Sequence, residues 1–278
     1  MLEITLLKVE HQTVGEARRL LPYIKECDVF GPESALLSRQ DAEYTDRNWE
    51  ERITKDISRT AFLKDLTETL ARTEPHPGIL AYKQKLFDYL FTEKKLLWHP
   101  ERHPDEQRTR ILAWKEGSTR RNRLAVDSLM TGDSDQFFAY TWEEVAMLET
   151  LVGERDKEMA RQFTDAEPNI RHRYPALAGK EPLRYAAFMG AAHKPERYMA
   201  KKPRIVPLGG EVTGIYERLR DALARGERTD EVKKDTLIWL NKSVFRFPEE
   251  QLLGLSLPEL IETTQQRLFE LKRAASRA

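Results

Sequence analysis

The stretch LLKVEHQTVGEARRLLPYIKECDVFGPE, residues 6–33, decides the fold of this chain. An apolar, β-branched run over residues 3–9 predicts a strand, and a shorter apolar run over residues 28–31 predicts a second one. Residues 13–27 lie between them and carry apolar side chains at helical spacing. A strand, a helix and a strand within about 30 residues are typical of a right-handed crossover that joins parallel neighbours. The stretch therefore predicts a parallel α/β sheet.

Polar side chains follow both strands of this unit. Glu10 and His11 end the first apolar run, and Glu33 ends the second. In open α/β sheets, ligands bind at the carboxyl ends of the strands. We therefore expect these three residues to lie at a ligand-binding edge.

The remainder of the chain continues the α/β pattern. Residues 41–132 are rich in charge and have a mostly helical pattern, which is clearest over 49–70 and 79–97. This segment predicts a helical insertion or lid. Residues 110–114 suggest a short strand within it. Further strands are predicted at 184–189 and 205–208, and helices at 212–224, 230–244 and 257–275. We predict one domain over residues 1–278, with a central, mostly parallel sheet flanked by helices and a helical insertion at about 41–132.

The composition limits the classes of partner. Lysine plus arginine and aspartate plus glutamate both number 46, so the formal charge is zero and we expect no nucleic-acid partner. No stretch approaches the roughly 20 apolar residues of a membrane-spanning helix, and the first residues do not resemble a signal peptide. We expect a soluble, cytoplasmic protein without membrane insertion. Cys27 is the single cysteine, so a metal would have to be held by histidines and carboxylates. The oligomeric state is left open.

One helix contains a charged residue on its apolar side. Thr141 and Glu144 form a capping-box pattern that predicts a helix start, and the helix would run to about residue 163. Helical periodicity places Arg155 within the apolar stripe, Asp156 near its edge and Glu154 away from its centre. A charged residue that faces the core needs a partner, so we expect Arg155 to meet a carboxylate or a ligand.

Two histidines follow predicted strands. His11 and His193, together with Glu33, would supply three ligands to a catalytic divalent metal and leave one position open for water. The competing interpretation is structural: His11 caps a turn, Glu33 caps the next helix and His193 begins a loop. His99 and His103 are four residues apart, but the neighbouring prolines favour a polar loop over a pair of helical ligands.

Three segments together resemble the TraB family, which includes the pheromone-shutdown proteins and the Tiki-type metalloproteases and is related to the erythromycin esterase and ChaN-like proteins. KVEHQT…CDVFGPE is similar to the opening G-x-x-H strand of the family with its following helix and strand. LVGERDKEMARQF resembles the family's Glu-Arg-Asp helix, and RYAAFMGAAHKP resembles its second G-x-x-H motif. The first motif departs from the family pattern, since Lys8 stands where glycine is usual and Glu10 directly precedes the histidine. The membrane helices of many TraB proteins have no counterpart in this sequence, which suggests a soluble variant with a different substrate.

The resemblance implies a metal-dependent hydrolase, most plausibly a peptidase. It places His11, Glu33, Arg155 and His193 at the site. His11, His193 and Glu33 would bind manganese, cobalt or zinc, with Glu33 as a ligand or general base and Arg155 holding a substrate carboxylate or the oxyanion. The lesser candidates are Glu10, Arg39 and Asp156. The alternative is a non-catalytic protein of the same fold that binds a peptide or small ligand, including haem, and a third interpretation is a structural partner with a decayed site.

Overall fold

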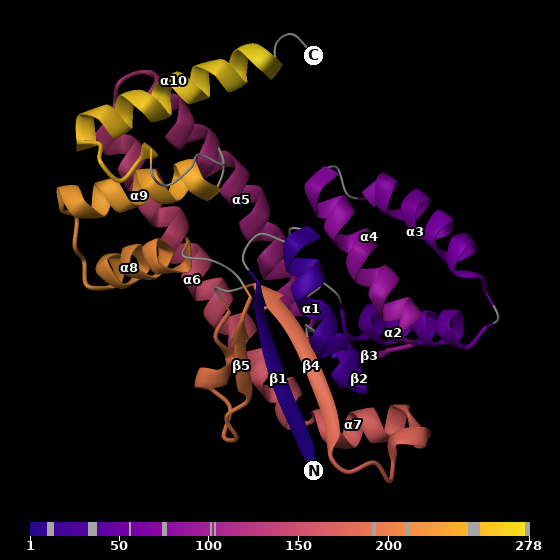
Figure 1. Ribbon diagram of the computed structural model, residues 1–278. Coiled ribbons are helices and arrows are strands. Elements are labelled where there is room, and N and C mark those ends of the chain that lie inside the picture. Colours follow the sequence, from indigo (N-terminus) through magenta and orange to yellow (C-terminus); the bar gives the residue numbers. More distant parts are fainter. Residues whose placement is uncertain are drawn as a thin grey trace. The chain divides into compact units, whose positions relative to one another are not determined.

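The computed structural model describes residues 1–9, 14–32, 38–55, 57–73, 77–100, 102, 104–190, 193–208, 212–243 and 251–275 (Figure 1). The chain forms two compact units. One comprises Met1–Arg108 with Gly153–Gly210, and the other comprises Thr109–Val152 with Glu211–Ala278.

The first unit contains a five-stranded, all-parallel sheet. Its strands are β1 (Leu2–Val9), β2 (Val29–Gly31), β3 (Leu96–Leu97), β4 (Leu183–Gly190) and β5 (Arg204–Pro207), in the order β3-β2-β4-β1-β5. The helices of this unit are α1 (Val14–Glu26), α2 (Arg39–Thr54), α3 (Arg59–Thr73), α4 (Pro77–Thr92), the last part of α6 (Ser134–Thr164) and α7 (Ala166–Arg173). This confirms the predicted α/β class and the parallel pairing.

Helices cover both faces of the sheet. Leu7, Phe30 and Phe188 pack on one face against α1 and the α2–α4 helices. Leu6 and Met189 point to the opposite face, where the last part of α6 and α7 pack. Because side chains alternate along a strand, the central strands β1 and β4 are apolar on both sides, which explains their nearly continuous apolar sequence.

The described elements that follow neighbouring strands lie on opposite faces of the sheet. β1 and β2 lead to α1 and α2, whose buried side chains share the core of Leu7 and Phe188. β4 instead leads to a short 3-10 turn, Pro195–Arg197, in which Glu196 contacts Lys8 on the other face. In open α/β sheets, ligands bind at the carboxyl ends of the strands where the connections change from one face to the other. β4 lies between β2 and β1, so its end is where the following elements change face.

The second unit is helical in its described residues. It contains most of α5 (Asp105–Met130), the first part of α6, α8 (Val212–Ala224), α9 (Asp230–Ser243) and α10 (Leu257–Ala275). Its core is apolar, with Leu129, Phe137, Leu237 and Leu260 all essentially inaccessible to solvent.

Two local predictions are wrong. Residues 110–114 are not a strand but lie inside α5, which starts with Asp105 and Glu106; acidic side chains favour the first turn of a helix. The capping box at Thr141 does not start a helix, because α6 already begins at Ser134, where the Asp133 side chain accepts a hydrogen bond from the backbone N–H of Gln136 at 3.0 Å. The hydroxyl of Thr141 donates to a carbonyl of the preceding turn instead.

The predicted helix at residues 49–70 is divided between α2 and α3.

None of the helices in the described ranges is both long enough and apolar enough to cross a membrane.

Candidate functional site

The centre of the candidate site is His193, in the loop after β4. Its backbone N–H donates to the carbonyl of Gly190, the last residue of the strand, at 3.0 Å, so the chain turns tightly there. The side chain is buried, with 4% of its surface exposed. The fold thus places an imidazole at the carboxyl end of the central strand and restricts its motion.

Asp156 on α6 fixes the orientation of this imidazole. Its Oδ1 lies 2.7 Å from Nδ1 of His193, and its Oδ2 accepts the backbone N–H of Lys194 at 2.7 Å. Asp156 is as buried as the histidine, with 4% exposed. A neutral imidazole that donates its Nδ1 proton to a carboxylate carries its lone pair on Nε2. The pair therefore sets both the ring orientation and the tautomer.

Lys8 lies beneath the His193 loop. Its Nζ donates to the backbone carbonyl of His193 and lies 3.1 Å from Oε2 of Glu196. Burial lowers the pKa of Lys8, while the Glu196 carboxylate opposes this shift. Lys8 is thus an internal cation that holds the loop in place from the β1 side.

The structure brings only some of the predicted residues together. Glu10, His11 and Glu33 lie outside the described residues. Arg39 is the first residue of α2 and forms an exposed ion pair with Glu43 at 3.4 Å. Arg155 is half-buried and precedes Asp156 on α6.

Periodicity assigned the inward position to the wrong charged residue of α6. Asp156 is the fully buried one, because it continues the stripe formed by Met159, Ala160 and Phe163, at three, four and seven residues' distance. Arg155 is displaced from that stripe by about 100 degrees. The buried charge of α6 that needs an internal partner is therefore Asp156, and His193 supplies that partner.

A second histidine-carboxylate pair escaped the sequence prediction. His99 lies two residues after β3, and its Nδ1 is 2.5 Å from Oδ1 of Asp46 on α2. Oδ2 of Asp46 accepts from Arg102 at 2.7 Å, and all three side chains are at least nine-tenths buried. His99 does lie in a loop, as the prolines predicted. The available signal was Asp46 itself, which occupies a position in the apolar stripe of α2 with Ala42, Trp49 and Ile53.

The described residues alone do not form a metal centre. Within them, no group of three or more His, Cys, Asp or Glu side chains is placed to hold a metal ion. A three-ligand set with His193 would have to include His11 and Glu33, whose placement the structure does not describe. His193 itself fits the role of a ligand, because metal-binding histidines usually donate their second N–H to a carboxylate, as His193 does to Asp156.

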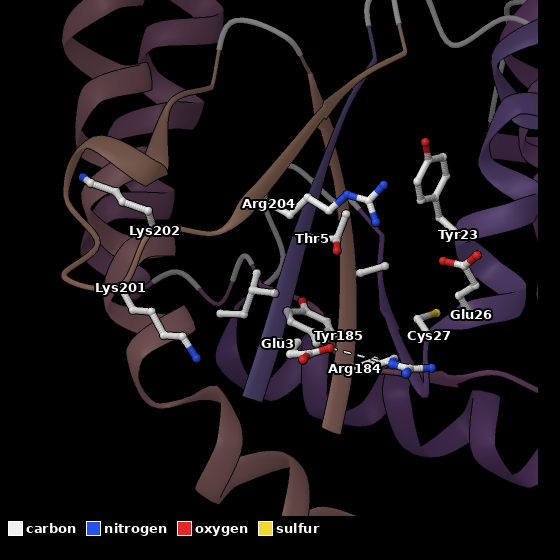
Figure 2. A pocket seen from close by; sticks show the side chains of 12 residues that line it. Glu3, Thr5, Tyr23, Glu26, Cys27, Arg184, Tyr185, Lys201, Lys202 and Arg204 are labelled. Atoms are coloured by element: carbon white, nitrogen blue, oxygen red, sulfur yellow. Dashed lines mark ion pairs between the residues drawn. The ribbon is translucent and has the colours of Figure 1, made fainter. Parts of the chain in front are cut away.

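A pocket of about 620 Å³ lies at the opposite, amino-terminal half of the sheet (Figure 2). Its lining includes Thr5, Cys27 and Ala186, together with exposed charged side chains such as Arg204 and Glu26. Thr5 is four residues before the carboxyl end of β1, a separation of about 13 Å along a strand. We do not assign the candidate site here, because the pocket is remote from the ends of the strands.

Comparison with known proteins adds no relative: no protein-family model, no curated protein and no solved structure matches this chain significantly. The TraB resemblance therefore rests on its three sequence motifs.

Proposed function

We propose that the protein is a metal-dependent hydrolase that acts on a peptide or amide bond at the carboxyl end of the sheet. His193 and His11 would bind manganese, cobalt or zinc, and Glu33 would be the third ligand or the general base. Arg155 would hold a substrate carboxylate or the oxyanion.

The observation that carries the proposal is the buried Asp156–His193 pair at the end of β4. The same arrangement, a carboxylate on the second nitrogen of a ligating histidine, orients ligands in metalloenzymes. Burial of a carboxylate is costly, and a fold that needed only a turn after β4 has no need of one there. Its position at the reversal of the chain direction also favours a ligand site.

The residues of this chain would divide the work as follows. When bound, a divalent metal would acidify a water molecule into a nucleophile and polarise the scissile carbonyl. Asp156 would keep Nε2 of His193 available as a ligand and stabilise positive charge on the ring. Lys8 and Glu196 would hold the His193 loop at a fixed height above β1.

Metal content tests this proposal. The wild type is purified without chelators, reconstituted separately with manganese, cobalt and zinc, and compared by elemental mass spectrometry with His193→Ala and His11→Ala. His172→Ala is the matched control, because His172 is an exposed histidine on α7. We expect near-stoichiometric metal in the wild type and control, and its loss in both site variants.

A metal-loaded protein is then screened against a peptide mixture by mass spectrometry, with Glu33→Gln as the inactive comparison. Turnover that disappears in Glu33→Gln supports hydrolysis. Failure of the wild type to hold any of the three metals contradicts the proposal and favours the alternative, a non-catalytic protein that binds a peptide or small ligand, including haem, at the same edge.

A further inference from the structure

The end of β3 carries a second histidine held in the same way as His193. Asp46 accepts hydrogen bonds from Nδ1 of His99 and from the guanidinium of Arg102. The positive charge of Arg102 balances the negative charge of this carboxylate. In neutral His99 the lone pair is therefore on Nε2, and this nitrogen makes no hydrogen bond with any residue that the structure describes. His99 thus has an oriented acceptor whose function the packing of the described chain does not account for.

The backbone around His99 is held as firmly as its ring. The hydroxyl of Tyr185 donates to the carbonyl of Trp98 at 2.9 Å, and the hydroxyl of Tyr174 donates to the carbonyl of Leu97 at 2.5 Å. Arg102 donates to the carbonyl of His99 at 3.1 Å. Three successive carbonyls are thus satisfied by side chains. Such support is typical of residues that must be positioned accurately for a ligand.

The two histidines are separated by one intervening strand. In the sheet order β3-β2-β4, the strands that lead to His99 and His193 are two spacings, about 10 Å, apart across the sheet. The last residue of β3, Leu97, is level with Ala186, four residues before the end of β4, so the histidines are also offset along the strands. One metal ion cannot bridge such a separation between strands. An extended peptide needs at least about three residues, at roughly 3.3–3.6 Å each, to cover it.

We propose that His99 is a second ligand-contacting residue of the carboxyl edge, whose Nε2 accepts a hydrogen bond from a backbone amide of a peptide that extends from His193 across the end of β2. The proposal rests on the proposed function, because it takes the reacting end of the peptide to lie at His193. It adds a substrate property: ligands must reach at least about three residues beyond the metal to gain this contact.

The substitution His99→Asn separates the two roles of the ring. The side-chain amide nitrogen of asparagine lies near the position of Nδ1, so the variant keeps a donor for Asp46 but has no atom at Nε2. The probes are acetyl-tetraalanine hydroxamate, which chelates a metal and extends past β2, and acetohydroxamate, which chelates only. Their dissociation constants are measured by calorimetry on the metal-loaded wild type, His99→Asn and the surface control His172→Asn.

We expect His99→Asn to weaken the long probe by about 2- to 10-fold, the effect of one lost hydrogen bond, and to leave the short probe and the metal content unchanged. Equal affinity of the wild type and His99→Asn for the long probe overturns the proposal and makes the pair a structural tie. Equal weakening of both probes also overturns it, since it indicates general disruption. A wild type that holds metal but binds both probes equally well refutes the second contact alone, whereas a wild type without metal refutes the proposed function and this inference together.

Discussion

Replacement of Asp156 by asparagine should remove most of the metal affinity while keeping the shape of the side chain. Asp156 accepts two hydrogen bonds, from Nδ1 of His193 and from the backbone N–H of Lys194, both at 2.7 Å. Asparagine offers only one oxygen. If that oxygen keeps the Lys194 bond, the new amide group faces Nδ1 and favours the tautomer with its proton on Nε2, which cannot bind a metal.

The size of the effect follows from this geometry. Loss of the carboxylate behind a metal-binding histidine typically costs 10- to 100-fold in affinity, about 1.4–2.8 kcal/mol. One charge-assisted hydrogen bond is also replaced by a neutral one within a buried site, so the free energy of unfolding without metal should fall by about 1–1.5 kcal/mol. The two losses are separable, because metal affinity and apo-protein stability are measured independently.

The assay is zinc competition with a chromophoric chelator, together with urea unfolding of the metal-free protein. Asp165→Asn is the control, since Asp165 lies one residue beyond α6 and its side chain is more than half exposed. An Asp156→Asn protein that folds and binds zinc within twofold of the wild type would refute the reasoning. So would an equal loss of affinity in Asp165→Asn.

Three further outcomes are expected. Burial lowers the pKa of Lys8, so between that pKa and about 10.4 the folded protein binds fewer protons than the unfolded chain, and its free energy of unfolding should rise with pH. Urea unfolding of Lys8→Met should show no such rise, and an unchanged dependence on pH would contradict the reasoning. Burial raises the pKa of Cys27 to about 12, so iodoacetamide at pH 8 should leave the thiol of the folded protein unmodified and alkylate it in urea, as mass spectrometry would show; rapid native labelling would be inconsistent with this burial. Leu237 is fully buried in the helical unit, so Leu237→Ala should lower its free energy of unfolding by about 2–5 kcal/mol and leave metal binding at His193 unchanged. Loss of metal from the folded variant would argue against placing the site in the sheet unit.

The sequence predicted those parts of the fold that depend on local pattern. The apolar runs of β1 and β4 and the intervening α1 were recognisable because strands buried on both faces are apolar without interruption. β3 was not predicted, because a strand of two residues shows no periodicity, and the predicted helix over residues 79–97 included it. The order of the strands was not predictable from the sequence, because β4 lies between β1 and β2 and pairs with residues more than 150 positions away.

The residues of the candidate site were likewise predictable only where they follow a local pattern. His193 was predicted because it follows a recognisable strand. Lys8 was noted only as a departure from a family pattern, and its contact with Glu196 spans 188 positions. His99 was assigned to a polar loop, and its partner Asp46 is 53 positions away. Pairings of this kind are set by the tertiary fold and leave no local trace.

The two histidine-carboxylate pairs nevertheless share a feature that sequence can express. Asp46 and Asp156 each interrupt the apolar stripe of a helix, on α2 and α6 respectively, and each meets a histidine that comes two or three residues after a parallel strand. A buried carboxylate without a partner destabilises a fold by several kcal/mol, so an aspartate in such a stripe predicts a donor at a strand end. His99 and His193 supply that donor from opposite sides of β2. Both histidines are held through Nδ1, so the neutral form of each carries its lone pair on Nε2. Under the proposed function, this shared constraint is the physical reason for treating the carboxyl edge as one binding surface.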